Sequence, residues 1–180
     1  MTRPARPSAE YLRLAALPPR EVEALMLRGE TPDIDALIDW EFRGLNLGAG
    51  ARLLGIRKFI KGFYRTPDGG AFGYNVRVRQ NGPAEPWRAR LHDGAPRRYA
   101  YFSVGPVDAA RRDNAYLHAL LLDYGAAGAG RFDVAAGLRD YLVRVEPGAD
   151  DLLLGKAFAA VGPWRLPVGY FLLERFRRPR

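Results

Sequence analysis

The sequence predicts a mainly β protein: an antiparallel up-and-down β-barrel of about eight to ten strands, with two short N-terminal helices and a helical lid segment. Short alternating runs of apolar and polar residues recur after residue 60, and Gly, Pro, Asp or Asn bounds each of them. Helices do not alternate with these strands, so a doubly wound parallel fold is excluded. A barrel is favoured over an open sheet because closure leaves no exposed edge.

The chain length and composition indicate one globular domain. Its 180 residues comprise 48% hydrophobic and 27% charged residues, which is the balance of a protein with a sizeable core. We expect residues 1–33 to form an arm and helices packed on the barrel. Residues 34–180 should form the barrel as a single domain.

Two short helices are expected at the N-terminus. Ser8 can cap the first helix over Ala9–Leu17, and Pro18 then ends it. The second helix should cover roughly Arg20–Arg28, with Gly29 as its C-cap. Neither helix is long enough to be a domain, so both should pack against the barrel.

The first strand and the lid are expected next. Trp40, Phe42 and Gly44 alternate with charged residues, a period of two that indicates a half-buried strand. Ala51–Ile60 fits a short amphipathic helix that would close one end of the barrel. Phe59–Tyr64 also alternates as a strand does, so the boundary between helix and strand stays open in the sequence.

The remaining strands follow from alternation and turn residues. His92–Gly94 and Glu146–Asp150 have turn composition, and the second is a strong hairpin signal. The expected strands after the lid are Ala71–Gln80, Trp87–Leu91, Arg98–Val104, Tyr116–Tyr124, Leu138–Val145, Asp151–Ala159 and Val168–Phe176.

Composition limits the chemistry and the location. The chain has no cysteine, which excludes disulfides, cysteine-bound zinc and thiol nucleophiles and is compatible with the cytoplasm, the location we expect. We expect no membrane span, because no apolar run approaches the roughly 18 residues that one needs. The net charge of +8 indicates an anionic partner or a solvated surface, and solvation is the favoured interpretation of Arg175–Arg180.

One region of the chain is similar to a known family. LPPREVEALMLRGETPDIDALIDWEFRG and the later LLGIRKFIKGF resemble the GXWXG family of lipocalin-like proteins, over roughly residues 17–80. Trp40 stands where the first Gly of the motif would be, Phe42 replaces its Trp, and Gly44 matches. RDYLVRV and DLLLGKAFA look like the closing strands of a calycin-type barrel. The resemblance implies a small barrel with an internal cavity, without an established chemistry.

The predicted function is therefore non-enzymatic binding of a small hydrophobic or amphiphilic ligand inside the barrel, with an anionic ligand as one option. Asp140 and Arg144 share one face of the strand expected over Leu138–Val145, and Lys156 lies on one face of the strand expected over Asp151–Ala159. If these faces point into the barrel, the three side chains could pair with one another or bind a carboxylate head group. The alternation alone does not decide whether these faces point into the barrel or toward solvent. The candidate ligand-binding residues are Trp40, Phe42, Phe63, Tyr74, Tyr101, Tyr116, His118, Arg144 and Lys156.

Other functions remain as alternatives. Trp87–Arg90 and Arg97–Tyr101 interleave aromatic and basic residues, as a module for nucleic acid or an anionic surface would. The same alternation also fits an amphipathic strand with its aromatic side chains in the core. No activated serine or phosphate loop is present, so an enzyme is a weaker hypothesis, centred on His118 with Asp140 or Tyr141. With only two histidines, we predict no metal site, and we expect no cofactor.

Overall fold

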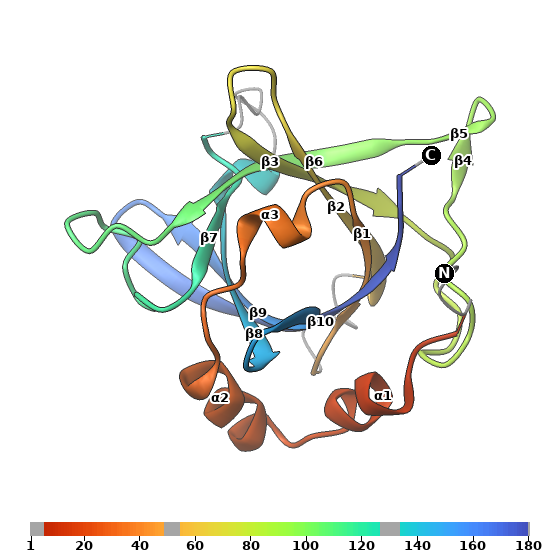
Figure 1. The fold of residues 1–180 in the computed structure, drawn as a ribbon, viewed down its shortest axis with the longest axis horizontal. Helices are drawn as coiled ribbons and strands as arrows, with labels where there is room; N and C mark the ends of the chain where they lie inside the picture. The colour runs from red at the N-terminus through yellow and green to blue at the C-terminus, as the bar shows by residue number, and fades with distance from the viewer. Residues whose placement is uncertain (1–5, 49–54, 127–133, 180) are drawn as a thin grey trace.

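The computed structural model describes residues 6–48, 55–126 and 134–179, and its central element is a closed antiparallel barrel. Each barrel strand pairs with the next along the chain, and β1 pairs with β10 to close the ring, as Figure 1 shows. The predicted fold class is confirmed. The eight strands are β1 (Glu41–Asn46), β2 (Lys58–Arg65), β3 (Ala71–Arg77), β6 (Arg98–Pro106), β7 (Leu120–Asp123), β8 (Leu138–Glu146), β9 (Ala149–Val161) and β10 (Trp164–Arg177).

A small separate hairpin interrupts the barrel between β3 and β6. It consists of β4 (Leu91–His92) and β5 (Ala95–Pro96). Asp93 and Gly94 both have positive φ, at 52° and 80°, as the two central residues of a type I′ turn require. The turn predicted at this position is confirmed.

The short helices lie on the outside and at one end of the barrel. The helices α1 (Ala9–Ala15) and α2 (Pro19–Arg28) pack against the outer face of β8, β9 and β10, at the bottom of Figure 1. The Ser8 hydroxyl accepts a hydrogen bond from the Tyr11 amide at 3.1 Å, which confirms the predicted N-cap. The remaining short elements are α3 (Ile34–Leu37) and the 3₁₀ turn η1 (Val134–Gly137).

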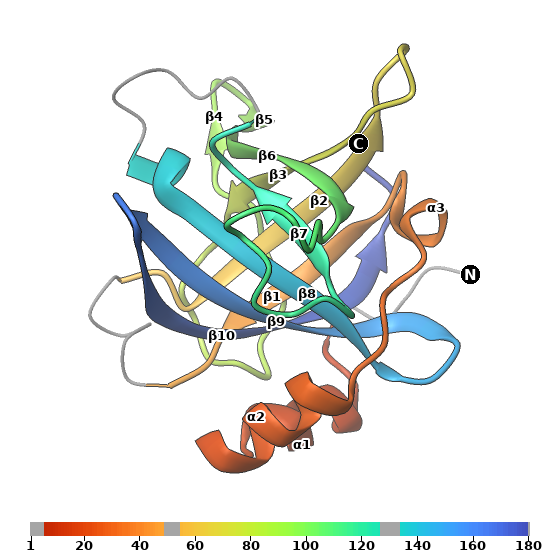
Figure 2. The ribbon, with the colours of Figure 1, turned by 90° about the vertical axis from the view of Figure 1, so that its left-hand side faces the viewer.

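The two ends of the barrel differ. Figure 1 shows α3 in front of one end, and Leu37 from this helix is buried with the interior aromatic residues. We call the other end the distal end; there β1, β3 and β9 finish and β2, β6 and β10 begin. In Figure 2 this end points away from α3.

Aromatic rings occupy much of the barrel interior. The rings of Phe42, Phe63, Phe102 and Tyr124 contact one another in series, with centroid separations of 5.6, 5.8 and 5.1 Å. A second apolar cluster lies outside the barrel wall, beneath α1 and α2, and includes Tyr11. Both faces of several strands are therefore buried.

Three sequence expectations need correction. Tyr116–Tyr124 is a strand only from Leu120 to Asp123, because the main chain before it forms a turn in which the Ala119 amide donates to the Tyr116 carbonyl at 3.1 Å. Trp87–Leu91 contributes only an isolated bridge, Ala89 to Val78, and the first residue of β4.

The third correction concerns the lid. Its residues 51–54 lie outside the described part of the chain, and Gly55–Arg57 is not helical. Lys58–Arg65 is strand β2, so strand is the correct one of the two structures considered for Phe59–Tyr64. No helix in the described ranges is long and apolar enough to cross a membrane.

Candidate binding site at the distal end of the barrel

The nine sequence-predicted ligand residues lie in several separate places. Phe42 and Phe63 are fully buried in the interior, as a lumen site requires. Trp40 lies just before β1 near α3, where the guanidinium carbons of Arg175 and Arg178 stand 4.8 and 4.1 Å from its ring centroid. Two of the nine residues therefore share the interior, and Trp40 borders its α3 end.

Two further predicted residues lie on the outer face of β3 and β6. The Tyr74 hydroxyl is buried and donates to Glu41 Oε1 at 3.2 Å. Tyr101 is 42% exposed, and its ring centroid lies 6.4 Å from that of Tyr74. Neither side chain faces the interior.

The last four predicted residues make contacts outside the interior. Lys156 donates to Glu23 Oε2 at 2.7 Å and to the Tyr116 hydroxyl at 2.6 Å, and His118 Nε2 lies 3.0 Å from the Met26 carbonyl oxygen. These bonds attach α2 to the barrel wall. Arg144 instead forms ion pairs with Glu30 and Asp150, at 2.9 and 3.8 Å.

A buried polar cluster of Lys61, Asp140, Tyr124 and Asn75 occupies the interior. Lys61 Nζ donates to the Tyr124 hydroxyl at 2.7 Å and lies 3.5 Å from Asp140 Oδ2, to which Tyr124 donates at 3.0 Å. Asn75 Nδ2 lies 3.5 Å from the Tyr124 hydroxyl. The other carboxylate oxygen, Asp140 Oδ1, is buried and has no hydrogen-bond partner in the described part of the chain.

Burial shifts both charged members of this cluster toward their neutral forms. Desolvation lowers the pKa of Lys61 to about 8, although the Asp140 charge opposes the shift. Desolvation also raises the pKa of Asp140, opposed by Lys61 and the Tyr124 hydrogen bond. Lys61 Nζ lies 4.3 Å from the Phe102 ring centroid and 5.3 Å from that of Phe171, so aromatic faces partly replace its hydration.

The lowered pKa predicts a pH dependence of stability. Between about 8 and the ordinary value of 10.5, Lys61 binds fewer protons in the folded than in the unfolded chain. Its contribution to the free energy of unfolding should therefore rise with pH in this window, by on the order of 1 kcal/mol per pH unit. Urea denaturation of the wild type and the Lys61→Met/Asp140→Leu double variant, compared across this window, measures the contribution. A difference between the two proteins that stays constant with pH would contradict the expectation.

A larger pocket opens at the distal end, close to this cluster. Its volume is about 420 Å³ and its lining residues come from the end of β3, the β4–β5 hairpin and the start of β6: Arg77, Arg90, Leu91, His92, Arg97 and Tyr99. Tyr99 is the register partner of Asn75 and therefore faces the interior with it. The Arg77 guanidinium carbon lies 5.3 Å from the Tyr99 ring centroid. Asn75 and Tyr99 thus connect the pocket to the buried cluster.

The pocket is basic. None of its lining residues is acidic, and among the described residues no carboxylate pairs with Arg77, Arg90 or Arg97. His92 Nδ1 lies 2.9 Å from Asp93 Oδ2 beside the pocket. Residues 77–98 contain six arginines, two acidic residues and no lysine, so their net charge is 6 − 2 = +4, half of the +8 of the whole chain.

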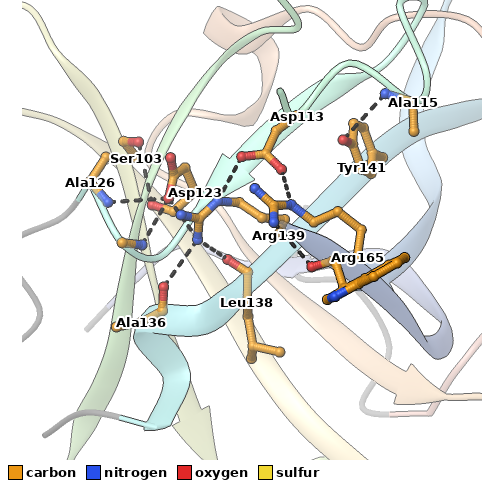
Figure 3. A network of polar contacts seen from close by, with 12 residues as sticks. Ser103, Asp113, Ala115, Asp123, Ala126, Ala136, Leu138, Arg139, Tyr141 and Arg165 are labelled. Atoms are coloured by element: carbon orange, nitrogen blue, oxygen red, sulfur yellow. Dashed lines mark hydrogen bonds and ion pairs between the residues drawn. The ribbon is translucent and has the colours of Figure 1, made fainter. Parts of the chain in front are cut away.

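Other arginines at the distal end have carboxylate partners. Figure 3 shows Asp113, in the β6–β7 connection, between Arg139 and Arg165. Arg139 also lies 3.0 Å from Asp123 Oδ1. Burial alone would raise the pKa of Asp113, but Arg165 and Arg139 hold it below its ordinary value. This network fastens the β6–β7 connection to the outer wall of the barrel, and the pocket arginines have no such partner among the described residues.

Sequence reasoning did not identify the pocket or the buried cluster. The usable signal was Lys61, which stands between Phe59 and Phe63 on the inward face of β2. A charged residue flanked at i−2 and i+2 by buried aromatic residues requires a buried partner. That partner, Asp140, is 79 residues away, and local alternation does not identify it.

Comparison with known proteins adds no family assignment. No protein-family model matches the chain, and searches of curated proteins and of solved structures find no match.

Proposed function

We propose that the protein binds a small anionic amphiphile at the distal pocket, without catalysing a reaction. The observation that carries this proposal is the pocket of about 420 Å³ lined by three arginines and no acidic residue. Planar guanidinium groups form paired hydrogen bonds with carboxylates and phosphates. Leu91 and Tyr99 offer apolar surface for the remainder of the ligand.

The interior packing favours the pocket over the lumen as the place where the ligand binds. Rings in edge contact occupy the space around Phe42 and Phe63, and a second, smaller pocket of about 40 Å³ lies between β1 and β10 beside Phe171. A volume of this size accommodates a water-sized group. The resemblance to lipocalin-like proteins supports ligand binding by analogy only.

A second candidate function is binding of single-stranded nucleic acid. The arginine-rich segment 77–98 favours it, together with the exposed Tyr101 and with Arg98, whose guanidinium carbon lies 4.1 Å from the Tyr74 ring centroid. Arginines beside aromatic rings are typical of surfaces that bind phosphates and bases.

Replacing two pocket arginines should weaken ligand binding. The Arg90→Ala/Arg97→Ala variant is expected to lose roughly tenfold or more in affinity for a medium-chain fatty acid, because charge-assisted hydrogen bonds are removed. Isothermal titration calorimetry measures the affinity, with the matching fatty alcohol as the neutral ligand. The Arg20→Ala/Arg28→Ala variant is the control, because it removes the same charge from exposed positions on α2.

The proposal fails if the alcohol and the acid bind equally well, or if the control variant loses as much affinity as the pocket variant. It also fails if two results are both negative: mass spectrometry finds no amphiphile bound to the purified protein, and calorimetry detects no binding of the added acid. Binding of a single-stranded oligonucleotide that weakens steeply with salt, without acid binding, would favour the second candidate instead.

A further inference from the structure

On its β10 side, the β9–β10 hairpin extends past the end of β1 at the distal end. Its strands contain 13 and 14 residues, more than any other strand. β10 pairs with β1 only from Phe171 onward, whereas its pairing with β9 continues back to Trp164. In Figure 2 the free end of this hairpin points away from α3. The segment before Gly169 therefore projects past the strand beside it.

The projecting segment is apolar and exposed. Val161, Trp164, Leu166 and Val168 are 55, 69, 52 and 37% exposed. They are half of the eight exposed large hydrophobic residues found in the described chain, and Leu91 on β4, at 64%, is a fifth at the same end. Exposed apolar residues that gather in one place indicate an interaction surface.

Val161, Trp164 and Leu166 share a face. Trp164 pairs with Val161 and Leu166 pairs with Ala159, and directly paired residues lie on the same side of a sheet. Further along both strands this side becomes the barrel interior, which includes Phe171. The apolar inner face of the barrel therefore continues onto the projecting segment, where it is exposed to solvent.

The free edge of the projection is poorly suited to pairing with another strand. Pro167 has no amide hydrogen, and the register shifts between Pro167 and Gly169. Proline and bulges are the features by which edge strands avoid such pairing. A partner that contacts the side-chain face is favoured over one that adds a strand.

Charge identifies the kind of partner. In an antiparallel barrel the end of β3 and the start of β6 lie at the same end as the β9–β10 turn. Arg77 and Arg97 therefore lie there, and so does Arg90, whose amide donates to the Arg77 carbonyl at 2.8 Å. Arg77, Arg90 and Arg97 are exposed at this end. Exposed tryptophan and leucine at the same end of the barrel as arginines without described carboxylate partners match the two layers of an anionic membrane surface.

We propose that the distal end docks on an anionic lipid bilayer, with Trp164 and Leu166 entering the head-group region and the arginines contacting lipid phosphates. Aromatic side chains favour this interfacial region, and arginine is attracted to anionic lipids. The inference goes beyond the proposed function, since it stands on the hairpin and does not require an occupied pocket.

Vesicle sedimentation tests the docking. We expect the protein to sediment with phosphatidylcholine vesicles that contain about 30% phosphatidylglycerol, and not with pure phosphatidylcholine. Raising the salt to about 0.5 M should weaken the binding. Trp164→Ser/Leu166→Ser should reduce binding about tenfold, because the buried apolar area is lost. Leu27→Ser is the control, since Leu27 is 59% exposed on α2.

Absence of binding to the anionic vesicles overturns the proposal, and so does binding that the Trp164→Ser/Leu166→Ser change leaves intact. Light scattering without vesicles examines the competing occupant: if the wild type is a dimer and this variant a monomer, a second copy of the chain covers the hairpin and lipid docking is wrong. The outcomes are separate from those of the pocket proposal, because the calorimetry with fatty acid uses no vesicles and leaves the hairpin unchanged.

Discussion

Replacing Asp140 by leucine should destabilise the protein by about 3–5 kcal/mol at neutral pH, because Lys61 would remain buried without its counter-charge. Both side chains are nearly inaccessible, at 2% for Lys61 and 5% for Asp140. Adding Lys61→Met should restore most of the lost stability, since an apolar pair of similar size needs no desolvation of charge. Urea denaturation of the two single variants and the double variant measures these differences.

A double variant that is as unstable as Asp140→Leu alone would contradict this expectation, because the loss would then come from packing and not from charge. Without the Asp140 charge the pKa of Lys61 should fall further below 8, so the Asp140→Leu loss should shrink as the pH rises toward 8 and stay constant above it. If the double variant is as stable as the wild type, the ion pair contributes no net stability.

Gly155→Ala should destabilise the barrel by about 1–3 kcal/mol through overpacking. A Cβ atom at Gly155 would lie only 2.0 Å from Cζ of Phe171, a buried ring on the neighbouring strand. Gly105→Ala is the matched control, since nothing lies within 4 Å of its Cβ position and Gly105 is also in a barrel strand. Thermal unfolding of both variants gives the comparison.

A smaller side chain at position 171 should relieve this clash. Gly155→Ala combined with Phe171→Leu is expected to lose less stability than the sum of the two single changes, because both act on the same contact. Strict additivity would show that the alanine is accommodated by some other movement. A Gly155→Ala variant as stable as Gly105→Ala would show that Phe171 moves without cost.

The strand pattern was predictable because alternation and turn residues are local. The Asp93–Gly94 turn and the β8–β9 turn lie where composition placed them. Which face of each strand points into the barrel was not predictable. Tyr74 is buried by outer-face contacts and Phe102 by the interior, so apolar character marks both sides of the wall.

The candidate site was less predictable than the fold, because distant parts of the sequence form it. Lys156 is neutralised by Glu23, 133 residues away, and so lies under α2 and not in the lumen. The pocket arginines looked like the polar face of a strand. Only the β4–β5 hairpin, which places Arg90 and Arg97 beside Arg77, makes them lining residues.

The pairing of β1 with β10 determines when the barrel can close during synthesis of the chain. The Arg177 guanidinium donates to the Glu41 carboxylate at 2.7 Å across 136 residues, so the ring cannot close until β10 has left the ribosome. Until then β1 and β9 each present an unpaired edge, and contacts of such long range form slowly. Until the ring closes, these unpaired edges are where a partly folded chain is prone to edge-to-edge association.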